Sequence, residues 1–448
     1  MSAVSARGGR RRTAVTLGSL GVGVALLLGA CAAPGASDTD DGDGNGGSGG
    51  GSLSVWVDAA RTPGAKQFKK EHPELDIHLT TIPNDPGYVL TKISLANEAG
   101  KGWPDVVFLN TPEDVASLAT KTFDYAQPVN DLVDDNVVEG FAEGSLSGCT
   151  FSGTLYCLRN DIGQTVLWYN KSLMTKFGYD VPQTWEAYGA LGARVAKEHP
   201  GYVIGDLNGK WGAGVYFTSS GCATRDVVDL KTVRIDTTGP KCARVAELLD
   251  PLLANGTVST LSASDPAFAK LGRQNKILML PAASWYGDYR FKTSYKSPSG
   301  QIAAAKMPTW KGEDTPYSGS VGGGAFVISK HAKSMDAAVQ FATWMTTNVD
   351  YQATQPTYPA FVAAAKAWGE KKSADAFYAE DPFPAMKAEA PLIRKTFGWV
   401  RYANEWNSTF NDTVVSAGDS DAPLSDAVQQ WGDRLTKAAE ADHYDVVQ

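Results

Sequence analysis

The sequence holds few of the residue patterns that mark a catalytic or metal-binding centre. No H-E-x-x-H motif occurs, and no metal-ligand spacing links its five histidines, His72, His78, His199, His331 and His443. No P-loop is present, because the Gly-Lys pairs at 100–101 and 209–210 are each followed by the wrong residue. The 49 acidic residues offer many carboxylates for glycosidase-like acid and base roles, but no pattern marks a pair. We therefore identify no catalytic residue, no metal ligand and no cofactor.

Two further motifs are interpreted as accidents of composition. Residues 46–50 match the G-x-S-x-G pattern of serine hydrolases, but no strand precedes them and no helix follows. Asp41, Asp43, Asn45 and Gly46 match half of an EF-hand loop, whose twelfth position is Ser52 instead of Glu. The surrounding segment is rich in Gly, Ser and Asp and has no aromatic residue. It cannot bury enough apolar surface to order itself, so we expect a flexible linker over residues 31–52.

The first residues have the pattern of a secretory signal peptide. Four arginines and no acid precede Cys31, and residues 14–28 form an uncharged stretch of 15 residues. A membrane-spanning helix needs about 20. Leu28-Gly29-Ala30-Cys31 resembles the lipobox of bacterial lipoproteins, in which the Cys thiol receives a diacylglyceryl group. We expect residues 1–30 to be removed and Cys31 to anchor the chain to the extracellular face of the cell membrane. An ordinary signal peptide with a Cys near its cleavage site is the alternative.

Charge and length limit the function and the domain count. Residues 1–30 hold four of the 41 Lys and Arg and none of the 49 Asp and Glu, so the processed chain has a net charge of −12. This acidic balance argues against nucleic-acid binding.

The remaining 418 residues exceed what one hydrophobic core usually supports, so we expect two lobes. The 12 Trp and 17 Tyr suggest a surface that uses aromatic faces.

Four cysteines remain besides Cys31: Cys149, Cys157, Cys222 and Cys242. An even number in an exported protein implies two disulfides, and three pairings exist on paper. We favour the local pairs, Cys149–Cys157 and Cys222–Cys242. Four buried free thiols are the alternative.

Apolar segments with strand character alternate with amphipathic segments along the chain. Strands are expected at 53–57, 76–80, 104–109, 276–280, 301–305 and 325–328. Helices are expected at 65–72, at 88–98 and over most of the chain from Met335 onward. This alternation predicts an α/β architecture with a largely parallel sheet.

Three short motifs follow one another between residues 153 and 186. They are G-x-x-Y-x-L at 153–158, Y-N-x-x-L at 169–173 and P-x-T-W-E at 182–186. Together with the apolar strand at 104–109, Ser284-Trp285 and the Gly-rich strand at 321–325, this order resembles the family-one extracellular solute-binding proteins, which include the maltodextrin-binding proteins. The resemblance covers nearly all of the mature chain. The sequence departs from the family at Arg159, where Gly or Pro is usual, and in its disulfides.

The resemblance implies a two-lobed periplasmic-binding-protein type II fold of the α/β class, with a mostly parallel sheet flanked by helices in each lobe and the ligand in the cleft between them. It assigns residues 53–159 and 311–355 to the N-terminal lobe and residues 160–310 and 356–448 to the C-terminal lobe. It further implies a monomeric binding protein of an ABC importer that closes around a di- or oligosaccharide and delivers it to the transmembrane permease subunits.

A sugar presents apolar C–H faces and hydroxyl groups, so its receptor needs aromatic faces, carboxylates, amides and Arg. On the resemblance, the ligand-binding residues are Asp58, Arg61, Glu113, Asp114, Asp161, Trp211, Trp285, Tyr286, Gly323, Tyr358 and Trp406. The glycine would let backbone amides approach the ligand. Other roles remain open: helix capping for Asp58, a solvated position for Arg61, a helix N-terminal charge for Asp114, and core packing for the aromatic residues.

Two other functions remain as alternatives. The same class of importer could bind a polyamine or an amino-acid derivative, for which the acids at 58, 113, 114 and 161 would supply the charge. An extracellular enzyme that acts on polysaccharide is the second alternative.

Overall fold

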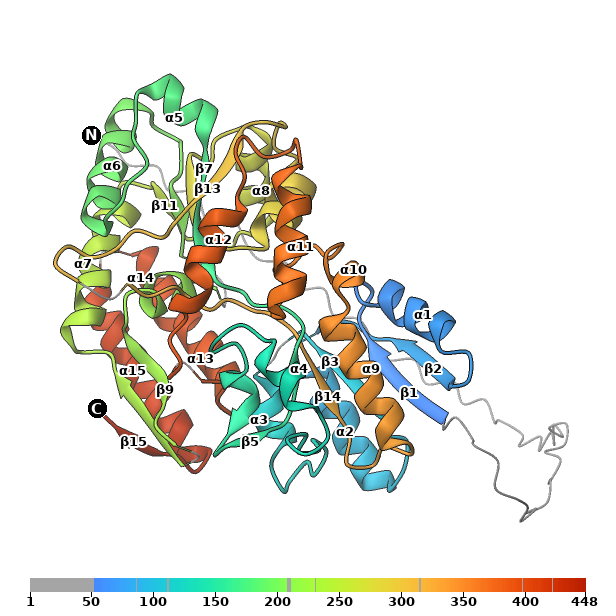
Figure 1. Cartoon of the computed structure of the whole chain (residues 1–448). Helices are drawn as coiled ribbons and strands as arrows, with labels where there is room; N and C mark the ends of the chain where they lie inside the picture. Colours follow the sequence, from blue (N-terminus) through green and yellow to red (C-terminus); the bar gives the residue numbers. More distant parts are fainter. Residues whose placement is uncertain are drawn as a thin grey trace, which may run out of the picture. The chain divides into compact units, whose positions relative to one another are not determined.

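The computed structural model describes residues 52–448, except for residues 86, 111–112, 208–210, 230, 314–315, 397 and 421 (Figure 1). The predicted signal peptide, the predicted lipidation site Cys31 and nearly all of the predicted linker lie outside the described residues. Among the helices of the described part, none is long and apolar enough to cross a membrane.

Of the strands in the described part, five form a mixed sheet in the order β2-β1-β3-β14-β6 (Figure 1). They are β1 Ser52–Val57, β2 Asp76–Thr81, β3 Val106–Leu109, β6 Leu158–Arg159 and β14 Ala325–Ile328. β1 pairs in parallel with β2 and β3, whereas β14 pairs antiparallel with β3 and β6. The sheet is therefore completed by a strand that comes much later in the sequence.

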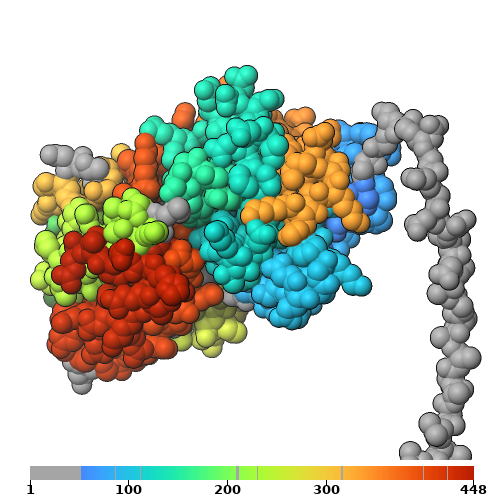
Figure 2. Space-filling model, turned by 90° about the horizontal axis from the view of Figure 1, so that it is seen from below, coloured from blue at the N-terminus to red at the C-terminus, as the bar shows by residue number. Residues whose placement is uncertain are grey.

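This sheet packs against helices in a hydrophobic cluster that we call the first core. The helices around it are α1 Thr62–Glu71, α2 Tyr88–Ala99, α3 Asp114–Leu118, α4 Asp135–Glu139, α9 Met335–Thr347 and α10 Val349–Gln352. Every second residue of β1 is buried, which places Leu53, Val55 and Val57 in the core. Phe68 of α1 meets Phe341 of α9 edge to face, with ring centroids 5.1 Å apart. In Figure 2 the orange residues of this late segment accordingly lie against the blue and cyan residues of the first sheet region.

A second sheet has the order β12-β7-β13. Its strands are β7 Thr165–Asn170, β12 Met279–Ala283 and β13 Ile302–Ala305. Shorter pairings join β8 Gly205–Asp206 to β11 Val258–Ser259 in parallel, and β9 Ala223–Val227, β10 Thr232–Asp236 and β15 Asp445–Val447 to one another. A small hairpin joins β4 Thr150–Phe151 to β5 Thr154–Leu155.

The direction of the second sheet corrects one detail of the sequence-based expectation. The alternation of strands and helices predicted largely parallel pairing, and the family resemblance implied it for each lobe, but β7 runs antiparallel to both β12 and β13. Alternation identifies the strands without fixing their direction, because the long connections between them allow either pairing. The predicted α/β class itself is correct.

The second sheet and its helices enclose another cluster, the second core. Its helices are α5 Lys171–Phe177, α6 Trp185–Glu198, α7 Pro240–Ala254, α8 Pro266–Arg273, α11 Val362–Ser373, α12 Phe383–Glu389, α13 Ala403–Phe410, α14 Ser416–Gly418 and α15 Leu424–Ala441. Less regular turns around it are η2 Ala213–Thr218, η3 Gly287–Ser294, η4 Ala390–Leu392 and η5 Asn411–Val415, whereas η1 Ser147–Cys149 belongs to the first core. Trp168, Trp185 and Trp431 are fully buried in this core.

Two of the sequence motifs have a clear structural role. Asn170 of the Y-N-x-x-L motif caps α5, because its side-chain oxygen accepts a hydrogen bond from the Leu173 N–H. Thr184 of the P-x-T-W-E motif caps α6 by accepting from the Ala187 N–H. Both motifs therefore mark helix starts.

The two favoured disulfides are present. Cys149–Cys157 closes a loop in the first core, and Cys222–Cys242 connects the start of β9 to α7 in the second core. The prediction of local pairing is confirmed.

Candidate functional site

A cavity of about 460 Å³ lies where the ends of β1 and β3 approach segments of the second core. Its lining residues are Asp58, Ala59, Ala60, Arg61, Asn84, Phe108, Asn110, Asp161, Trp211, Trp285, Tyr289, Arg290, Gly322, Gly323, Gly324 and Thr357. Concave sites with a few convergent polar groups beside aromatic rings are typical of small-molecule binding. Two larger hollows, of about 800 and 680 Å³, are lined by one tryptophan at most.

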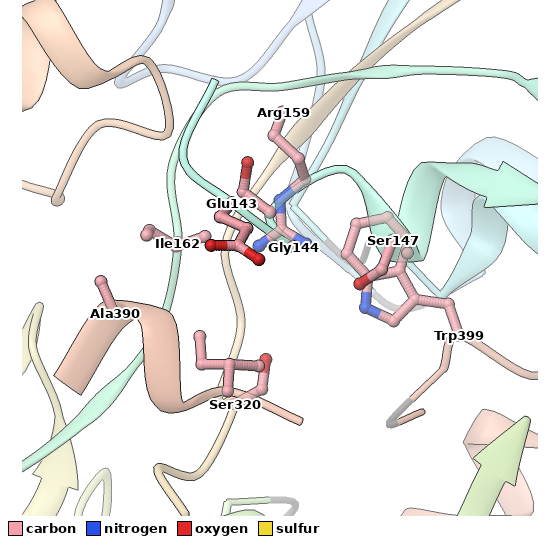
Figure 3. Close-up of a pocket in the computed structure, with 11 residues that line it drawn as sticks. Glu143, Gly144, Ser147, Arg159, Ile162, Ser320, Ala390 and Trp399 are labelled. Carbon is pink, nitrogen blue, oxygen red and sulfur yellow. The ribbon is translucent and has the colours of Figure 1, made fainter. Parts of the chain in front are cut away.

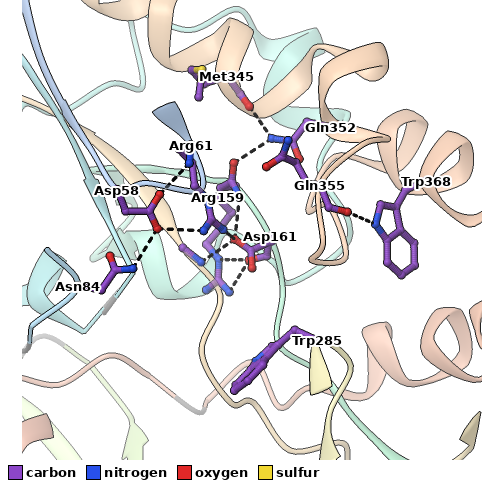
Figure 4. A network of polar contacts seen from close by, with 12 residues as sticks. Asp58, Arg61, Asn84, Arg159, Asp161, Trp285, Met345, Gln352, Gln355 and Trp368 are labelled. Atoms are coloured by element: carbon purple, nitrogen blue, oxygen red, sulfur yellow. Dashed lines mark hydrogen bonds and ion pairs between the residues drawn. The ribbon is translucent and has the colours of Figure 1, made fainter. Parts of the chain in front are cut away.

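The polar side of this cavity joins three buried charged residues, Asp58, Arg61 and Asp161, to the exposed amide of Asn84 (Figure 4). Arg61 donates through Nη1 to Asp58 Oδ2 and through Nη2 to Asp161 Oδ1, each at 3.2 Å. Asn84 Nδ2 donates to the same Asp58 oxygen at 3.3 Å. The two acids and the arginine are each at most 6 % exposed. One positive charge therefore lies between two negative charges, and the group carries one net negative charge.

Local structure brings Arg61 to this position. It precedes the first turn of α1, and its backbone N–H donates to Asp58 Oδ1 at 2.8 Å, so the acid orders the turn after β1. Its guanidinium lies 4.4 Å above the Phe108 ring of β3. Burial alone would lower the pKa of Arg61, but the carboxylates of Asp161 and Asp58 raise the pKa above its ordinary value. The arginine stays charged.

Asp161 presents one oxygen to the protein and one to the cavity. Its Oδ1 accepts from Arg61 Nη2, from Asn160 Nδ2 at 2.8 Å and from the Gly324 N–H at 2.9 Å. Within the described part of the chain, no donor reaches its Oδ2. Thr357 also lines the cavity, and its buried Oγ1 has no hydrogen-bond partner among the described residues. Asp161 Oδ2 can therefore accept a hydrogen bond from a ligand hydroxyl.

Gly323 is required by the close packing behind the cavity. Its φ is +92°, and a Cβ there would lie 2.3 Å from Arg159 Nη2 and 2.7 Å from the Asp161 carbonyl oxygen. Arg159 donates through Nε and Nη2 to that carbonyl, and Trp399 lies against its other face at 4.4 Å (Figure 3). Burial lowers the pKa of Arg159 to about 10. The void lined by Arg159 and Trp399 has a volume of about 20 Å³, which fits no more than about one water molecule.

The opposite, aromatic side consists of Trp211, Trp285, Tyr289 and Arg290. Trp285 Nε1 donates to the Val321 carbonyl at 2.9 Å, which fixes the orientation of its ring. The Trp211 and Trp285 rings meet edge to face at 5.9 Å and 74°. Gly322, with φ +82°, leaves room beside them, since its missing Cβ would lie 3.5 Å from Trp285 Nε1. These rings offer flat apolar surface to a ligand.

Six of the eleven predicted ligand-binding residues line the cavity: Asp58, Arg61, Asp161, Trp211, Trp285 and Gly323. The other five do not line it: Glu113, Asp114, Tyr286, Tyr358 and Trp406. Tyr286, Tyr358 and Trp406 are nearly fully buried in the second core. Asp114 begins α3 and lines a separate small hollow.

Glu113 and Trp406 meet the same arginine outside the cavity lining. Arg225 of β9 approaches Glu113 Oε1 to 3.5 Å and lies 4.2 Å above the Trp406 ring. Trp406 Nε1 donates to Thr224 Oγ1 at 3.0 Å. The tryptophan is covered by protein, so we leave it out of the proposed binding set, and its ligand contact stays a prediction.

Several lining residues were not among the predicted ones. Tyr289 and Arg290 follow Trp285 by about one helical turn, so the spacing from this tryptophan could have indicated them. Asn110 directly follows β3, three residues before the predicted Glu113, so the end of this strand could have indicated it. Asn84 and Thr357 have no sequence signal that we recognise. No cluster of three or more potential metal ligands occurs in the part of the chain that the structure describes.

The chain is similar in sequence to known proteins. The sequence pattern of the family described as bacterial extracellular solute-binding protein matches residues 51–352. An arabinooligosaccharide-binding protein of Bacillus subtilis is 25 % identical over 292 residues, which cover 62 % of this chain and 63 % of that protein. The chain thus matches less than two thirds of the length of this curated relative.

Solved structures share the fold. The galacto-N-biose/lacto-N-biose I-binding protein of an ABC transporter from Bifidobacterium longum, in complex with lacto-N-biose, has a TM-score of 0.75 at 20 % identity and covers 90 % of this chain and 100 % of its own. An ABC transporter associated binding protein from B. animalis subsp. lactis, in complex with β-1,6-galactobiose, has a TM-score of 0.71 at 19 % identity and covers 89 % and 99 %. These likenesses establish the two-lobed fold.

Proposed function

This chain belongs to the family of bacterial extracellular solute-binding proteins, and from that premise we propose that it binds a di- or oligosaccharide in the 460 Å³ cavity and delivers it to the permease of an ABC importer. The observation that carries the proposal is the pairing of a buried carboxylate–arginine network with two tryptophan faces across one cavity. Carboxylates can bond sugar hydroxyls while an aromatic ring covers the C–H face. The curated relative and the two structural neighbours are named for sugars, which supports this ligand class.

We assign the binding roles to six residues, Asp58, Arg61, Asp161, Trp211, Trp285 and Gly323. The lobes are proposed to comprise residues 53–159 with 311–355, and residues 160–310 with 356–448. The positions of β14 and α9 in the first core support the assignment of 311–355. Closure of the lobes on the ligand would be driven by the contacts that the second lobe adds.

The polyamine alternative has less support. Of the four acids that would bind a polycation, only Asp58 and Asp161 line the cavity, and both are paired with Arg61. One net negative charge remains, too little for a ligand with several ammonium groups.

An enzymatic role also has little support, and we propose that the protein is not an enzyme. A glycosidase needs one carboxyl as acid and another as base or nucleophile on either side of the substrate bond. Asp58 and Asp161 instead lie on either side of Arg61, which occupies the space between them. Incubation with oligosaccharides should therefore release no shorter products.

We further propose that the protein is a monomer held at the extracellular face of the membrane by a lipid on Cys31. Cells that express the chain should incorporate labelled palmitate into it, and Cys31→Ser should abolish this incorporation. Equal labelling of the Cys31→Ser variant would refute lipidation at this residue.

The function is tested by a thermal-shift screen of the mature protein against mono-, di- and oligosaccharides, with polyamines and amino acids as controls. A ligand that binds only the native state raises its stability by about 2.7 kcal/mol at a hundredfold excess over Kd. A shift with a set of sugars that Trp211→Ala weakens would support the proposal. A shift with polyamines or amino acids alone would refute the sugar and keep the importer.

A further inference from the structure

Arg290 brings a second guanidinium to the cavity, on the aromatic side. It lies on η3, and its Cζ is 5.9 Å from the Trp285 ring centroid and 5.8 Å from that of Tyr286. A ligand ring stacked on Trp285 would therefore carry its substituents toward a positive charge.

The two arginines of the cavity differ in their partners. Arg61 is paired with two carboxylates, whereas Arg290 makes no ion pair with any carboxylate of the described residues. Its Nη2 donates to the neutral hydroxyl of Ser264 at 2.6 Å. Its Nε is buried and has no hydrogen-bond partner in the part of the chain that is described. Arg290 is only half-buried and has no ion pair among the described residues, so its charge is available to a ligand carboxylate.

The acids near Arg290 do not supply that charge fully. Asp288 lies close in sequence, but Lys372 is its ion-pair partner. Asp206 of β8 interacts electrostatically with Arg290 but forms no ion pair with it. Burial raises the pKa of Asp206 to about 7, so near neutral pH it is only partly ionised.

We propose that Arg290 selects a carboxylate on the ligand, so that the bound sugar is a uronic acid or an oligosaccharide that carries one. This inference rests on the proposed function and specifies the ligand class of the same site. A guanidinium binds a carboxylate through two parallel hydrogen bonds, a geometry that a neutral hydroxymethyl group cannot reproduce. The carboxylates of Asp58 and Asp161 would repel the ligand's acid, so the ligand is oriented with its carboxylate toward Arg290 and its hydroxyls toward the polar side.

The test compares sugars that differ in a single group. Calorimetric titration of the mature protein would use galactose against galacturonic acid, glucose against glucuronic acid, and galactobiose against digalacturonic acid. We expect at least one acidic sugar to bind ten times more tightly than its neutral counterpart, and this preference to shrink as salt is raised.

Variants then assign the preference to Arg290. Arg290→Gln should lose tenfold or more in affinity for the acidic sugar while its affinity for the neutral one changes less than threefold, and Arg290→Lys should keep part of the preference. Arg234→Gln, an exposed arginine that lines a different hollow, serves as the matched control. Equal affinity for both members of every pair, or equal losses for both in Arg290→Gln, would overturn the inference and leave sugar binding intact. If no sugar of either kind binds, the proposed function itself fails.

Discussion

On the polar side of the cavity, the groups that face a ligand are bonded to one another by ion pairs. On the aromatic side, the rings are held by a hydrogen bond and by contacts with other aromatic rings. Asp58, Arg61 and Asp161 form a buried chain of ion pairs. Trp285 is held by one hydrogen bond from its Nε1 and by ring contacts with Trp211, Tyr286 and Tyr289. The polar side is therefore part of what stabilises the empty protein, while the aromatic side mainly contributes area when a ligand arrives.

This difference predicts whether a mutation changes mainly the free energy of unfolding or mainly the affinity. A change on the polar side leaves a buried charge without its partner, so it should lower the free energy of unfolding as well as the affinity. A change on the aromatic side removes surface that the ligand covers, so it should mainly lower affinity.

The largest expected effect comes from breaking the polar side at its centre. Arg61→Leu removes the cation between two carboxylates that are each at most 2 % exposed. Loss of one partner from a buried ion pair costs about 3–5 kcal/mol, so denaturant unfolding should show a loss of stability of that size.

Arg194→Leu is the matched control for Arg61→Leu. Arg194 is also paired with an acid, Glu198, but its side chain is 55 % exposed. An exposed pair of this kind contributes less than about 1 kcal/mol. If the two variants lose similar stability, the polar network does not stabilise the protein without ligand. The proposed difference between the polar and aromatic sides of the cavity would then be wrong.

The next prediction concerns the stability contribution of Asp206, a buried acid that interacts electrostatically with Arg290. Its pKa is raised from 3.8 to about 7, chiefly by burial, so the folded protein holds this proton more tightly than the unfolded chain. The contribution of Asp206 to stability is therefore fully present below about pH 4 and is lost as pH rises to about 7, by roughly 4 kcal/mol at most. Asp206→Asn should be stabilised relative to the natural protein by an amount that grows over this range and is constant above it.

Thermal unfolding of both proteins at a series of pH values measures this difference. The positive charge of Arg290 favours the ionised form of Asp206. Tyrosines lie around the same carboxylate, and burial raises the pKa of each above its ordinary value: Tyr188, Tyr216, Tyr286 and Tyr295. A difference between the two proteins that does not change with pH would contradict the prediction.

Trp285→Ala tests whether the aromatic side of the cavity contributes to affinity. Truncating a central aromatic contact should weaken binding of the sugar found in the screen by about 30- to 100-fold, or roughly 2–3 kcal/mol, as titration calorimetry would measure. Trp103→Ala removes another half-buried tryptophan, which stacks on His331 at 3.9 Å and does not line the cavity. Its affinity should be unchanged. Equal weakening in both variants would mean that Trp285 acts only through general stability.

The sequence predicted the cavity lining best where a residue directly follows a strand. Asp58 and Arg61 come after β1, and Asp161 comes after β6, so strand ends alone place them near the same edge of the first sheet. Trp285 likewise follows β12. The short apolar strands were recognisable in the sequence, and the α/β class of the fold was predictable from them.

Asn84 depends on backbone geometry that no local pattern encodes, because the chain after β2 returns toward Asp58. Arg290 lies on the π-helix η3, about one turn after Trp285, so its position could be indicated only once Trp285 was recognised. Trp406, which the resemblance suggested as a ligand contact, does not line the cavity. Whether a tryptophan on a late helix faces a cavity or lies under Arg225 depends on contacts between distant segments, which sequence position does not specify.

The smallest expected effect compares the two disulfides, one in each core. Cys149–Cys157 closes a separation of 8 residues and Cys222–Cys242 a separation of 20. In the chain-entropy description, the longer loop gives more stabilisation by about 0.8 kcal/mol. All four cysteines are at most 1 % exposed, so the cost of burying serine hydroxyls in the Cys149→Ser/Cys157→Ser and Cys222→Ser/Cys242→Ser pairs largely cancels. Denaturant unfolding should therefore find the second pair the less stable. The reverse order would show that the short loop, which precedes β6 and Asp161, stabilises the native polar side itself rather than only restricting the unfolded chain.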